Sequence, residues 1–377
     1  MQYNTPVASG QIIKIGSVSL KVTVSSTSGS EGSGRGIVYY APITLSNQQS
    51  SGTSSGFQQM IYFNPSTYSS NEMANLSNIE FTADAPIGTS GNVPLYAWIE
   101  SGASSSATNT VAWVNLASNT LGAAGSGTNT LTIYMNFLPN NSPVTSGYTG
   151  YAPQLYCASG CFQTSYAQYD DGGSVFNFYD NFAGTTLNTN KWSSTIGSGG
   201  SITVNNGITI SETDKSNIQS FIQSVNQYSN NQFIEFYTNS ITLPSGNWGW
   251  IGSFTGTPTS TNWGVTSGLG YAIEMISPPN PSYNIMYSNL GQTAGGSSSL
   301  NSQILSVIWL SNDNSIIFSN YNNAYDLTYS SYSPSSNIGL FAGINNAGTS
   351  SFTVMWFRTR SYPPNGVMPS ASFGSII

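Results

Sequence analysis

Short runs of alternating apolar and polar residues, separated by clusters of Gly, Ser, Asn and Pro, repeat along almost the whole chain. Alternation with a period of two is typical of strands that bury one face, and the turn-forming clusters mark the strand ends. Between residues 37 and 172 these runs include V-P-L-Y-A-W-I-E, T-V-A-W-V-N-L and T-L-T-I-Y-M-N-F. Many short strands at this spacing predict a β-sandwich domain.

The same pattern resumes between residues 173 and 362, in runs such as Q-F-I-E-F-Y-T and F-T-V-M-W-F-R, and it predicts a second sandwich. Residues 363–377 contain three prolines and are expected to form an extended tail. Residues 216–228 fit either a strand or an amphipathic helix, because four apolar side chains there recur at helical spacing. These four are Ile218, Phe221, Ile222 and Val225. The predicted fold is therefore all-β, with two antiparallel, jelly-roll-like sandwiches.

Residues 1–36 are expected to form an N-terminal extended arm. The run Q-I-I-K-I-G-S-V-S-L-K-V-T-V has the period of a half-buried strand, and a Ser/Gly-rich linker follows it. A strand on a flexible linker could complete a neighbour's sheet or its own. The start of the chain has no basic segment followed by an apolar stretch, so we expect a removed leader or export by another route, such as inside a virion.

Charged residues make up 6% of the chain, against roughly 25% in typical soluble domains. Histidine is absent, whereas aromatic residues reach 13%. The remaining surface groups hydrogen-bond to water without titrating in the ordinary range, so the surface changes little with pH. This composition favours an extracellular location, on a cell or a virion, in a hot, acidic or variable setting.

The net charge of −7 disfavours nucleic acid and anionic membranes as partners, because phosphate binding needs clustered basic side chains. Arg358 and Arg360 form the one near-cluster of basic residues. No apolar run approaches the roughly 20 residues of a membrane span, so we expect no membrane insertion.

Cys157 and Cys161, in C-A-S-G-C, favour a small disulfide loop over free thiols. Two thiols without histidine make a poor metal site, and no cofactor or metal is expected. Three acids near residue 175 could hold a structural calcium, but turn-forming roles are favoured. These acids are Asp170, Asp171 and Asp180.

Two Asn-x-Ser sequences, at Asn75 and Asn140, are candidate glycosylation sites, although chance matches are an equal alternative in so Asn- and Ser-rich a chain.

A cluster of aromatic residues flanked by glycine lies between residues 247 and 271. Aromatic faces in loops can stack on sugar rings while neighbouring amides bind the hydroxyls. The alternative is that the same side chains fill the core of the sandwich. The candidate glycan-binding residues are Asn247, Trp248, Trp250, Asn262, Trp263 and Tyr271.

The absence of histidine excludes Ser-His-Asp and Cys-His nucleophile systems. Glu235 and Glu274, on two predicted strands, could flank a sugar as a carboxylate pair, but solvated strand acids are the favoured interpretation. Glu100 is expected to hydrogen-bond locally, with Arg35 or Lys21 as alternative partners. The sequence therefore predicts no enzyme and no catalytic residue.

The segments L-Y-A-W-I-E-S-G (residues 95–102), V-A-W-V-N-L and L-T-I-Y-M-N-F resemble a domain of unknown function common in archaeal surface and viral proteins. Residues 169–192 resemble the way such domains lead into a concanavalin/laminin-G-like jelly roll. The resemblance covers residues 40–362 and implies extracellular display and glycan contact.

The expected function is therefore surface recognition, as a glycan-binding attachment protein of an archaeal cell or virion, with cell-surface glycans or glycoproteins as partners. The alternative is a structural subunit of a virion spike, turret or extracellular filament that self-associates, or binds other surface proteins, through its arm. A glycoside hydrolase of concanavalin-like fold is the third and least favoured interpretation.

Overall fold

The computed structural model describes the backbone and side chains of most of the chain after residue 37. These residues are 38–139, 147–157, 163–213, 220–244, 249, 251–256, 302–310, 336–344 and 348–377. Backbone alone is described for residue 250, residue 335 and seven strands: β1 (Ile12–Ile15), β2 (Val18–Lys21), β19 (Leu269–Ile276), β20 (Ser282–Tyr287), β21 (Leu290–Ala294), β23 (Ser315–Ser319) and β24 (Ala324–Thr328). The chain divides into two units, residues 1–36 and 37–377. In the first unit, β1 and β2 pair as an antiparallel hairpin.

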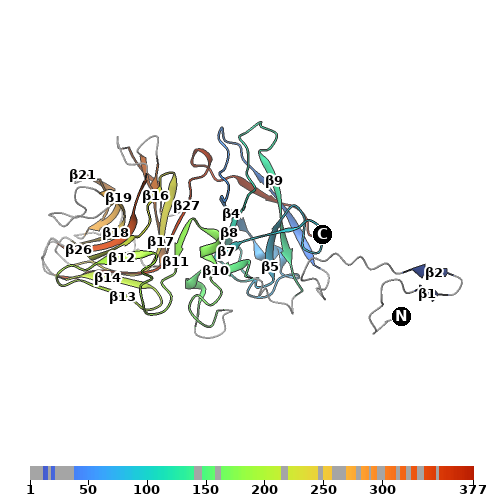
Figure 1. Ribbon diagram of the computed structural model, residues 1–377, viewed down its shortest axis with the longest axis horizontal. Coiled ribbons are helices and arrows are strands. Elements are labelled where there is room, and N and C mark those ends of the chain that lie inside the picture. The colour runs from blue at the N-terminus through green and yellow to red at the C-terminus, as the bar shows by residue number, and fades with distance from the viewer. Residues whose placement is uncertain are drawn as a thin grey trace. The chain divides into compact units, whose positions relative to one another are not determined.

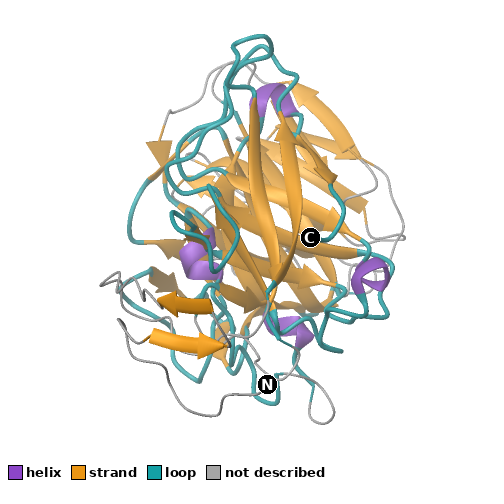
Figure 2. Ribbon diagram, turned by 90° about the vertical axis from the view of Figure 1, so that its right-hand side faces the viewer, coloured by secondary structure: helices purple, strands orange, loops and turns teal. Residues whose placement is uncertain are grey.

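The second unit is built almost entirely of strands, as predicted, with a few single-turn helices (Figures 1 and 2). Within the described residues, no helix is long and apolar enough to cross a membrane.

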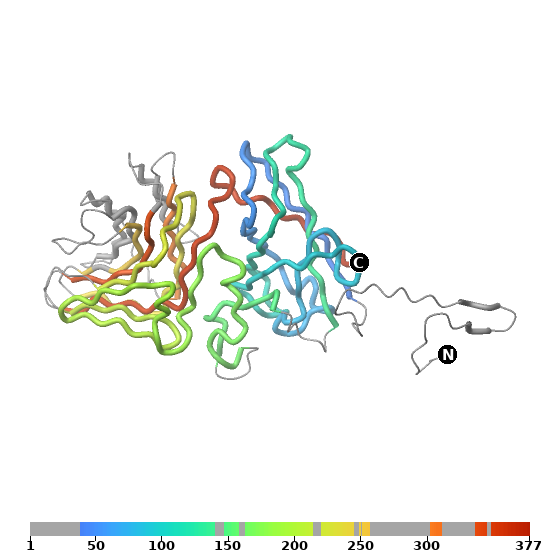
Figure 3. The backbone as a smooth tube through the Cα atoms, viewed as in Figure 1, coloured from blue at the N-terminus to red at the C-terminus, as the bar shows by residue number. Residues whose placement is uncertain are grey.

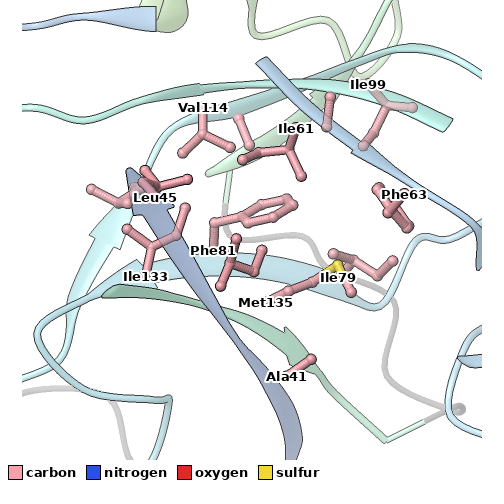
Figure 4. Packing of buried hydrophobic residues seen from close by; sticks show 14 of the residues in the cluster. Ala41, Leu45, Ile61, Phe63, Ile79, Phe81, Ile99, Val114, Ile133 and Met135 are labelled. Carbon is pink, nitrogen blue, oxygen red and sulfur yellow. The ribbon is translucent and has the colours of Figure 1, made fainter. Parts of the chain in front are cut away.

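The first sandwich contains a five-stranded sheet, in the order β28-β3-β9-β5-β6, and a four-stranded sheet, in the order β10-β7-β8-β4. Alternate residues of facing strands fill the space between the sheets, with Leu45, Phe81 and Ile133 opposite Ile61 and Val114 (Figure 4). Its strands are β3 (Tyr39–Ser46), β4 (Gln58–Phe63), β5 (Ile79–Ala83), β6 (Val93–Leu95), β7 (Ala97–Ser101), β8 (Thr110–Asn115), β9 (Thr130–Phe137), β10 (Thr149–Tyr151) and β28 (Ser370–Phe373). The short helices are η1 (Pro65–Tyr68), η2 (Pro153–Leu155), α1 (Gly172–Val175) and η3 (Pro364–Gly366).

The second sandwich contains two sheets. The first has the order β13-β14-β27-β17-β22-β23-β24, and β11 also pairs with β27. The second has the order β12-β15-β26-β18-β19-β20-β21. Ile234, Phe236 and Val354 from the first of these sheets pack against Ile222 and Leu340 from the second. The strands not yet given are β11 (Phe178–Asp180), β12 (Trp192–Thr195), β13 (Ser201–Val204), β14 (Ile208–Glu212), β15 (Ser220–Ser224), β16 (Tyr228–Ser229), β17 (Gln232–Thr242), β18 (Gly249–Gly256), β22 (Gln303–Trp309), β25 (Ser335–Ser336), β26 (Ile338–Ile344) and β27 (Ser350–Ser361).

The structure defines two segments that the sequence left open or placed outside the sandwiches, residues 216–228 and the C-terminal tail. The part of residues 216–228 that fitted a helix or a strand contains β15, whose Ile222 enters the core while Phe221 lies on the opposite face beside Phe254. The predicted tail contains β28, which pairs antiparallel with β3, so the last residues belong to the first sandwich. Residues 150–180 lead from the first sandwich into the second, and β27 leads back toward β28 (Figure 3). The domain limits near residues 172 and 362 stay predictions.

Deleting residues 368–377 should destabilise the fold, because β28 is hydrogen-bonded to β3 and Phe373 packs on Phe63 and Tyr68. We expect a loss of about 1.5–3 kcal/mol in chemical denaturation, because the partly buried Met368, Phe373 and Ile376 together remove from water about as much apolar surface as one fully buried large side chain. Deleting residues 1–36, which form a separate unit, should leave the same midpoint unchanged. Equal midpoints for both deletions would contradict this role of β28.

Candidate functional site

A buried arginine joins the two sandwiches. Strand β27 has a bulge between Val354 and Trp356, which inserts one extra residue and reverses the alternation of side chains between the two faces of the sheet. Val354 and Phe357 therefore both point into the core, and Arg358 lies on the opposite face. Arg358 is fully buried, and its Nη2 lies 2.7 Å from Oε2 of Glu100 in β7. Its Nε donates to Oε2 of Glu235 in β17 at 2.6 Å. One guanidinium therefore connects carboxylates from both sandwiches.

A second arginine completes this network. Arg360 donates from Nε to Oε2 of Glu235 at 3.0 Å and from Nη2 to Oε1 at 2.9 Å. Burial alone would raise the pKa of Glu235, but the charges and hydrogen bonds of Arg358 and Arg360 outweigh it and hold the pKa at about 2. The near-cluster of basic residues seen in the sequence is thus a pair of internal counterions.

Aromatic rings enclose the guanidinium of Arg358. Its Cζ lies 4.6 Å from the ring centres of Phe176 and Trp356, 4.9 Å from Trp113 and 5.3 Å from Trp98. Cation–π contacts of this kind strengthen when water is excluded. Trp113 also donates from Nε1 to Oε2 of Glu100 at 2.8 Å. The carboxylate of Glu100 is therefore held by two donors in a fixed orientation.

A second buried carboxylate, Asp170, lies beside this cluster. It accepts hydrogen bonds from Trp98 Nε1 (2.7 Å), Tyr179 Oη (2.6 Å), Asn181 Nδ2 (2.7 Å) and the amide of Gly172 (3.0 Å). Burial raises the pKa of Asp170, and these hydrogen bonds oppose the increase. Four protein donors therefore occupy the carboxylate.

Asp180 has a similar structural role, since it accepts from Trp192 Nε1 at 2.6 Å and from the amide of Phe182 at 3.1 Å. In the part of the chain that the structure describes, no three acids, cysteines or histidines form a metal-binding group.

A pocket of about 620 Å³ lies next to Glu100, between strands of the first sandwich and strands β17 and β22 of the second. Tyr62, at 54% exposure, lies at the open side, and the apolar lining residues are Met60, Val111, Leu155 and Ile304. The polar lining residues are Tyr62, Glu100, Ser101, Gln154, Tyr237, Ser302 and Gln303.

Two of the lining side chains are held rigidly. Gln154 donates from Nε2 to the carbonyl oxygen of Glu100 at 2.9 Å, and its Oε1 accepts from Trp356 Nε1 at 2.7 Å. The ring of Tyr237 stacks on Trp356, with the ring centres 6.0 Å apart and the planes at 28°. Gln154, Tyr237 and Glu100 therefore provide amide, aromatic and carboxylate groups whose orientations are fixed before any ligand binds.

The sequence analysis did not identify this pocket, and it assigned Glu100 to other partners. Glu100 pairs with Arg358, and the side chains of the alternative partners Arg35 and Lys21 lie outside the described structure. The predicted carboxylate pair is also revised, because Glu235 is enclosed by two arginines, whereas solvent exposure was expected. Glu274 lies in β19, which is described by its backbone alone.

The candidate glycan-binding residues stay predictions. Trp250 lies in β18 and Tyr271 in β19, without described side chains. The other four lie outside the described residues: Asn247, Trp248, Asn262 and Trp263.

The modification sites are also untested. Cys157 is described and Cys161 is not, so the disulfide stays a prediction. Asn75 is half-buried and accepts from the amide of Ser77 at 3.2 Å, and Asn140 lies outside the described residues.

A further unusual carboxyl group was missed by the sequence analysis. Glu72, which follows η1, is 4% exposed, and neither carboxyl oxygen has a hydrogen-bond partner in the described structure. Burial raises the pKa of Glu72 to about 8, so the side chain is protonated at neutral pH.

No known protein family matches the sequence. Over 154 residues the chain is 35% identical to uncharacterized protein 562 of Sulfolobus islandicus rod-shaped virus 1. The match covers 41% of this chain and 24% of that protein, so the chain spans about a quarter of the relative's length. The predicted resemblance to archaeal viral proteins is thus supported in part, by sequence similarity to an uncharacterized protein of an archaeal virus.

Similar solved structures include an endo-β-1,3-glucanase from Pyrococcus furiosus, at 13% identity and a TM-score of 0.36, covering 50% of this chain and 94% of the glucanase. The catalytic domain of an endo-1,3-β-glucanase from Thermotoga petrophila is 11% identical, with a TM-score of 0.35, and covers 49% of this chain and 96% of its own. The predicted all-β, sandwich fold is confirmed by the strands and sheets of the chain itself.

The functional expectation is corrected. Similar structures are mostly glycoside hydrolases, which contradicts the expectation of a non-enzymatic attachment protein or structural subunit. Carboxylate chemistry was set aside at the level of the sequence because Glu235 and Glu274 were expected to be solvated strand acids, and the buried Glu100 was expected only to hydrogen-bond locally.

Replacing Arg358 with Met should destabilise the protein by about 3–5 kcal/mol, because it removes a charge shared by the buried Glu100 and Glu235. The free energy of unfolding from denaturant titration measures this loss. Lys191→Met is the control: it removes a partly exposed amine that donates to the carbonyl oxygen of Tyr179 at 2.6 Å and lies 4.0 Å from Asp180, and it should cost less. Similar losses in the two variants would contradict a central role for the Arg358 network.

Glu72 should make the protein less stable as pH rises from about 4.5 to 8. Folding raises the pKa of Glu72 from about 4.5 to about 8. Its contribution to stability is therefore fully present below pH 4.5, where the side chain is protonated in both states, and it is lost as pH rises through the pKa of the folded protein. Glu72→Gln should therefore flatten the pH dependence of unfolding in this range and stabilise the protein at pH 8 by about 1–3 kcal/mol. A variant with the pH profile of the original protein would exclude this assignment.

Proposed function

We propose that this chain is a carbohydrate-degrading enzyme that binds a neutral polysaccharide in the pocket between the sandwiches. The observation that carries the proposal is the composition of this pocket, where Glu100 lies among two tyrosines and two glutamines in a volume of about 620 Å³. That volume is within the range of small-molecule sites.

The lining matches the chemistry of sugars. Hydroxyl groups both donate and accept hydrogen bonds, and the amides of Gln154 and Gln303 offer both functions. Tyrosine rings supply flat faces for the apolar side of a sugar ring and a hydroxyl at the edge. The pocket lining contains no lysine or arginine among the described residues, which favours a neutral ligand over a phosphate or a carboxylate.

Glu100 supplies the group that glycoside hydrolysis needs most. In inverting enzymes one carboxylate takes the proton of the attacking water, and in retaining enzymes it attacks the anomeric carbon itself. Trp113 and Arg358 hold Oε2 of Glu100, so the carboxylate is oriented without a bound substrate. Glu100 is the one carboxylate among the described lining residues, and we assign it the role of base or nucleophile.

Laminarin, barley β-glucan, xylan and mannan form the substrate panel, assayed for release of reducing sugar between about pH 2 and 7. Glu100→Gln keeps the shape and the acceptor for Trp113, and it should lower the rate by about 10²–10⁴-fold. Asp84→Asn is the matched control, because Asp84 is exposed and has a positive φ that asparagine tolerates. Glu274→Gln tests a second carboxylate.

Two results would overturn the proposal. One is the absence of reducing-sugar release from every polysaccharide of the panel. The other is full activity of Glu100→Gln at wild-type stability.

A further inference from the structure

We infer that Gln154 is the specificity-determining residue of the pocket, that Trp356 positions it, and that together they select sugars with two adjacent free hydroxyl groups. This inference rests on the proposed function, since it concerns the ligand of the same site.

The amide of Gln154 has one orientation. Its Oε1 accepts from Trp356 Nε1, and its Nε2 donates to the carbonyl oxygen of Glu100. If the amide were rotated by 180°, its NH₂ group would face the indole N–H and its oxygen would face a carbonyl oxygen. Both hydrogen bonds would be lost, so the position of the donor and the acceptor is fixed.

The fixed amide keeps half of its hydrogen-bonding capacity. A glutamine side chain offers two N–H donors and two lone pairs, and within the described structure Gln154 uses one of each. One donor and one acceptor remain on a half-buried side chain that lines the pocket. Two adjacent hydroxyls of a sugar, one accepting and one donating, complement this pair, whereas O-methyl or sulfate groups remove the donor.

Trp356 contacts both the amide of Gln154 and the ring of Tyr237. The side chain is fully buried, its N–H orients Gln154, and its ring stacks on Tyr237. The guanidinium of Arg358, 4.6 Å above the same ring, keeps the indole in place. Trp356 therefore links the polar and the aromatic parts of the pocket without contacting the ligand.

The test measures binding of β-1,4-linked cellohexaose and mannohexaose and of β-1,3-linked laminarihexaose by isothermal titration calorimetry, with the Glu100→Gln form as background so that hydrolysis is slow during the titration. The internal residues of the first two carry adjacent free hydroxyls at C2 and C3, whereas laminarihexaose is linked through O3 and should bind more weakly. Gln154→Met removes the amide at similar volume, and Trp356→Phe removes the indole donor but keeps an aromatic ring. Trp356→Phe should weaken binding of the preferred hexaose about threefold to tenfold, and Gln154→Met, which removes both the donor and the acceptor, about tenfold to a hundredfold. The double variant should lose less than the product of the two effects, because both act through Gln154.

Trp309→Phe is the matched control. Trp309 is also buried, but its Nε1 has no hydrogen-bond partner within the described structure. It should lose core packing like Trp356→Phe while keeping wild-type affinity. In the active background, Gln154→Met and Trp356→Phe should raise KM and leave kcat nearly unchanged. Fully O-methylated cellohexaose should bind weakly, and Gln154→Met should not weaken it further.

The outcomes separate this inference from the proposed function. Wild-type affinity in Gln154→Met or Trp356→Phe, or equal losses in Trp309→Phe, would overturn the inference alone. Binding that depends on Gln154 without hydrolysis of any polysaccharide would overturn the proposed function alone. No binding of any hexaose would overturn both.

Discussion

The structure depends on the guanidinium of Arg358, which is removed from water and shared between Glu100 of the first sandwich and Glu235 of the second. A buried charge is costly unless its partners are well placed, so this arrangement tolerates few alternative packings of the two sandwiches. The aromatic rings around it exclude water and add cation–π attraction. The pocket exists because this contact fixes strands of both sandwiches at its walls.

Two buried glutamates, Glu235 and Glu72, change the stability of the protein in opposite directions as the pH falls. Glu235 has a pKa of about 2, so its contribution to stability is present above its unfolded pKa and is lost only as pH falls toward 2. Glu72 is stabilising in its protonated form, and that contribution is complete below its unfolded pKa. Together these two groups favour the folded state most at mildly acidic pH. A surface with few titratable groups adds little to either effect.

The strands could be predicted from the sequence because a period of two directly reports burial of one face, as Ala97 and Ile99 in β7 show. The same period placed Trp98 and Glu100 on the other face, but no local pattern states what that face meets. In β27 a bulge shifts the alternation, so the inward and outward residues could not be assigned by counting. The ion network and the pocket follow from contacts between residues more than 100 positions apart, such as Glu235 with Arg358, which no sequence window contains.

The central claim is that the pocket between the sandwiches holds a sugar against Glu100. A crystal structure of the Glu100→Gln variant with cellohexaose tests it most directly. The account predicts sugar density in this pocket, between Tyr62 and Tyr237, with a hydroxyl within hydrogen-bond distance of Gln154. Sugar bound elsewhere, with the pocket empty or filled by water, would contradict the account.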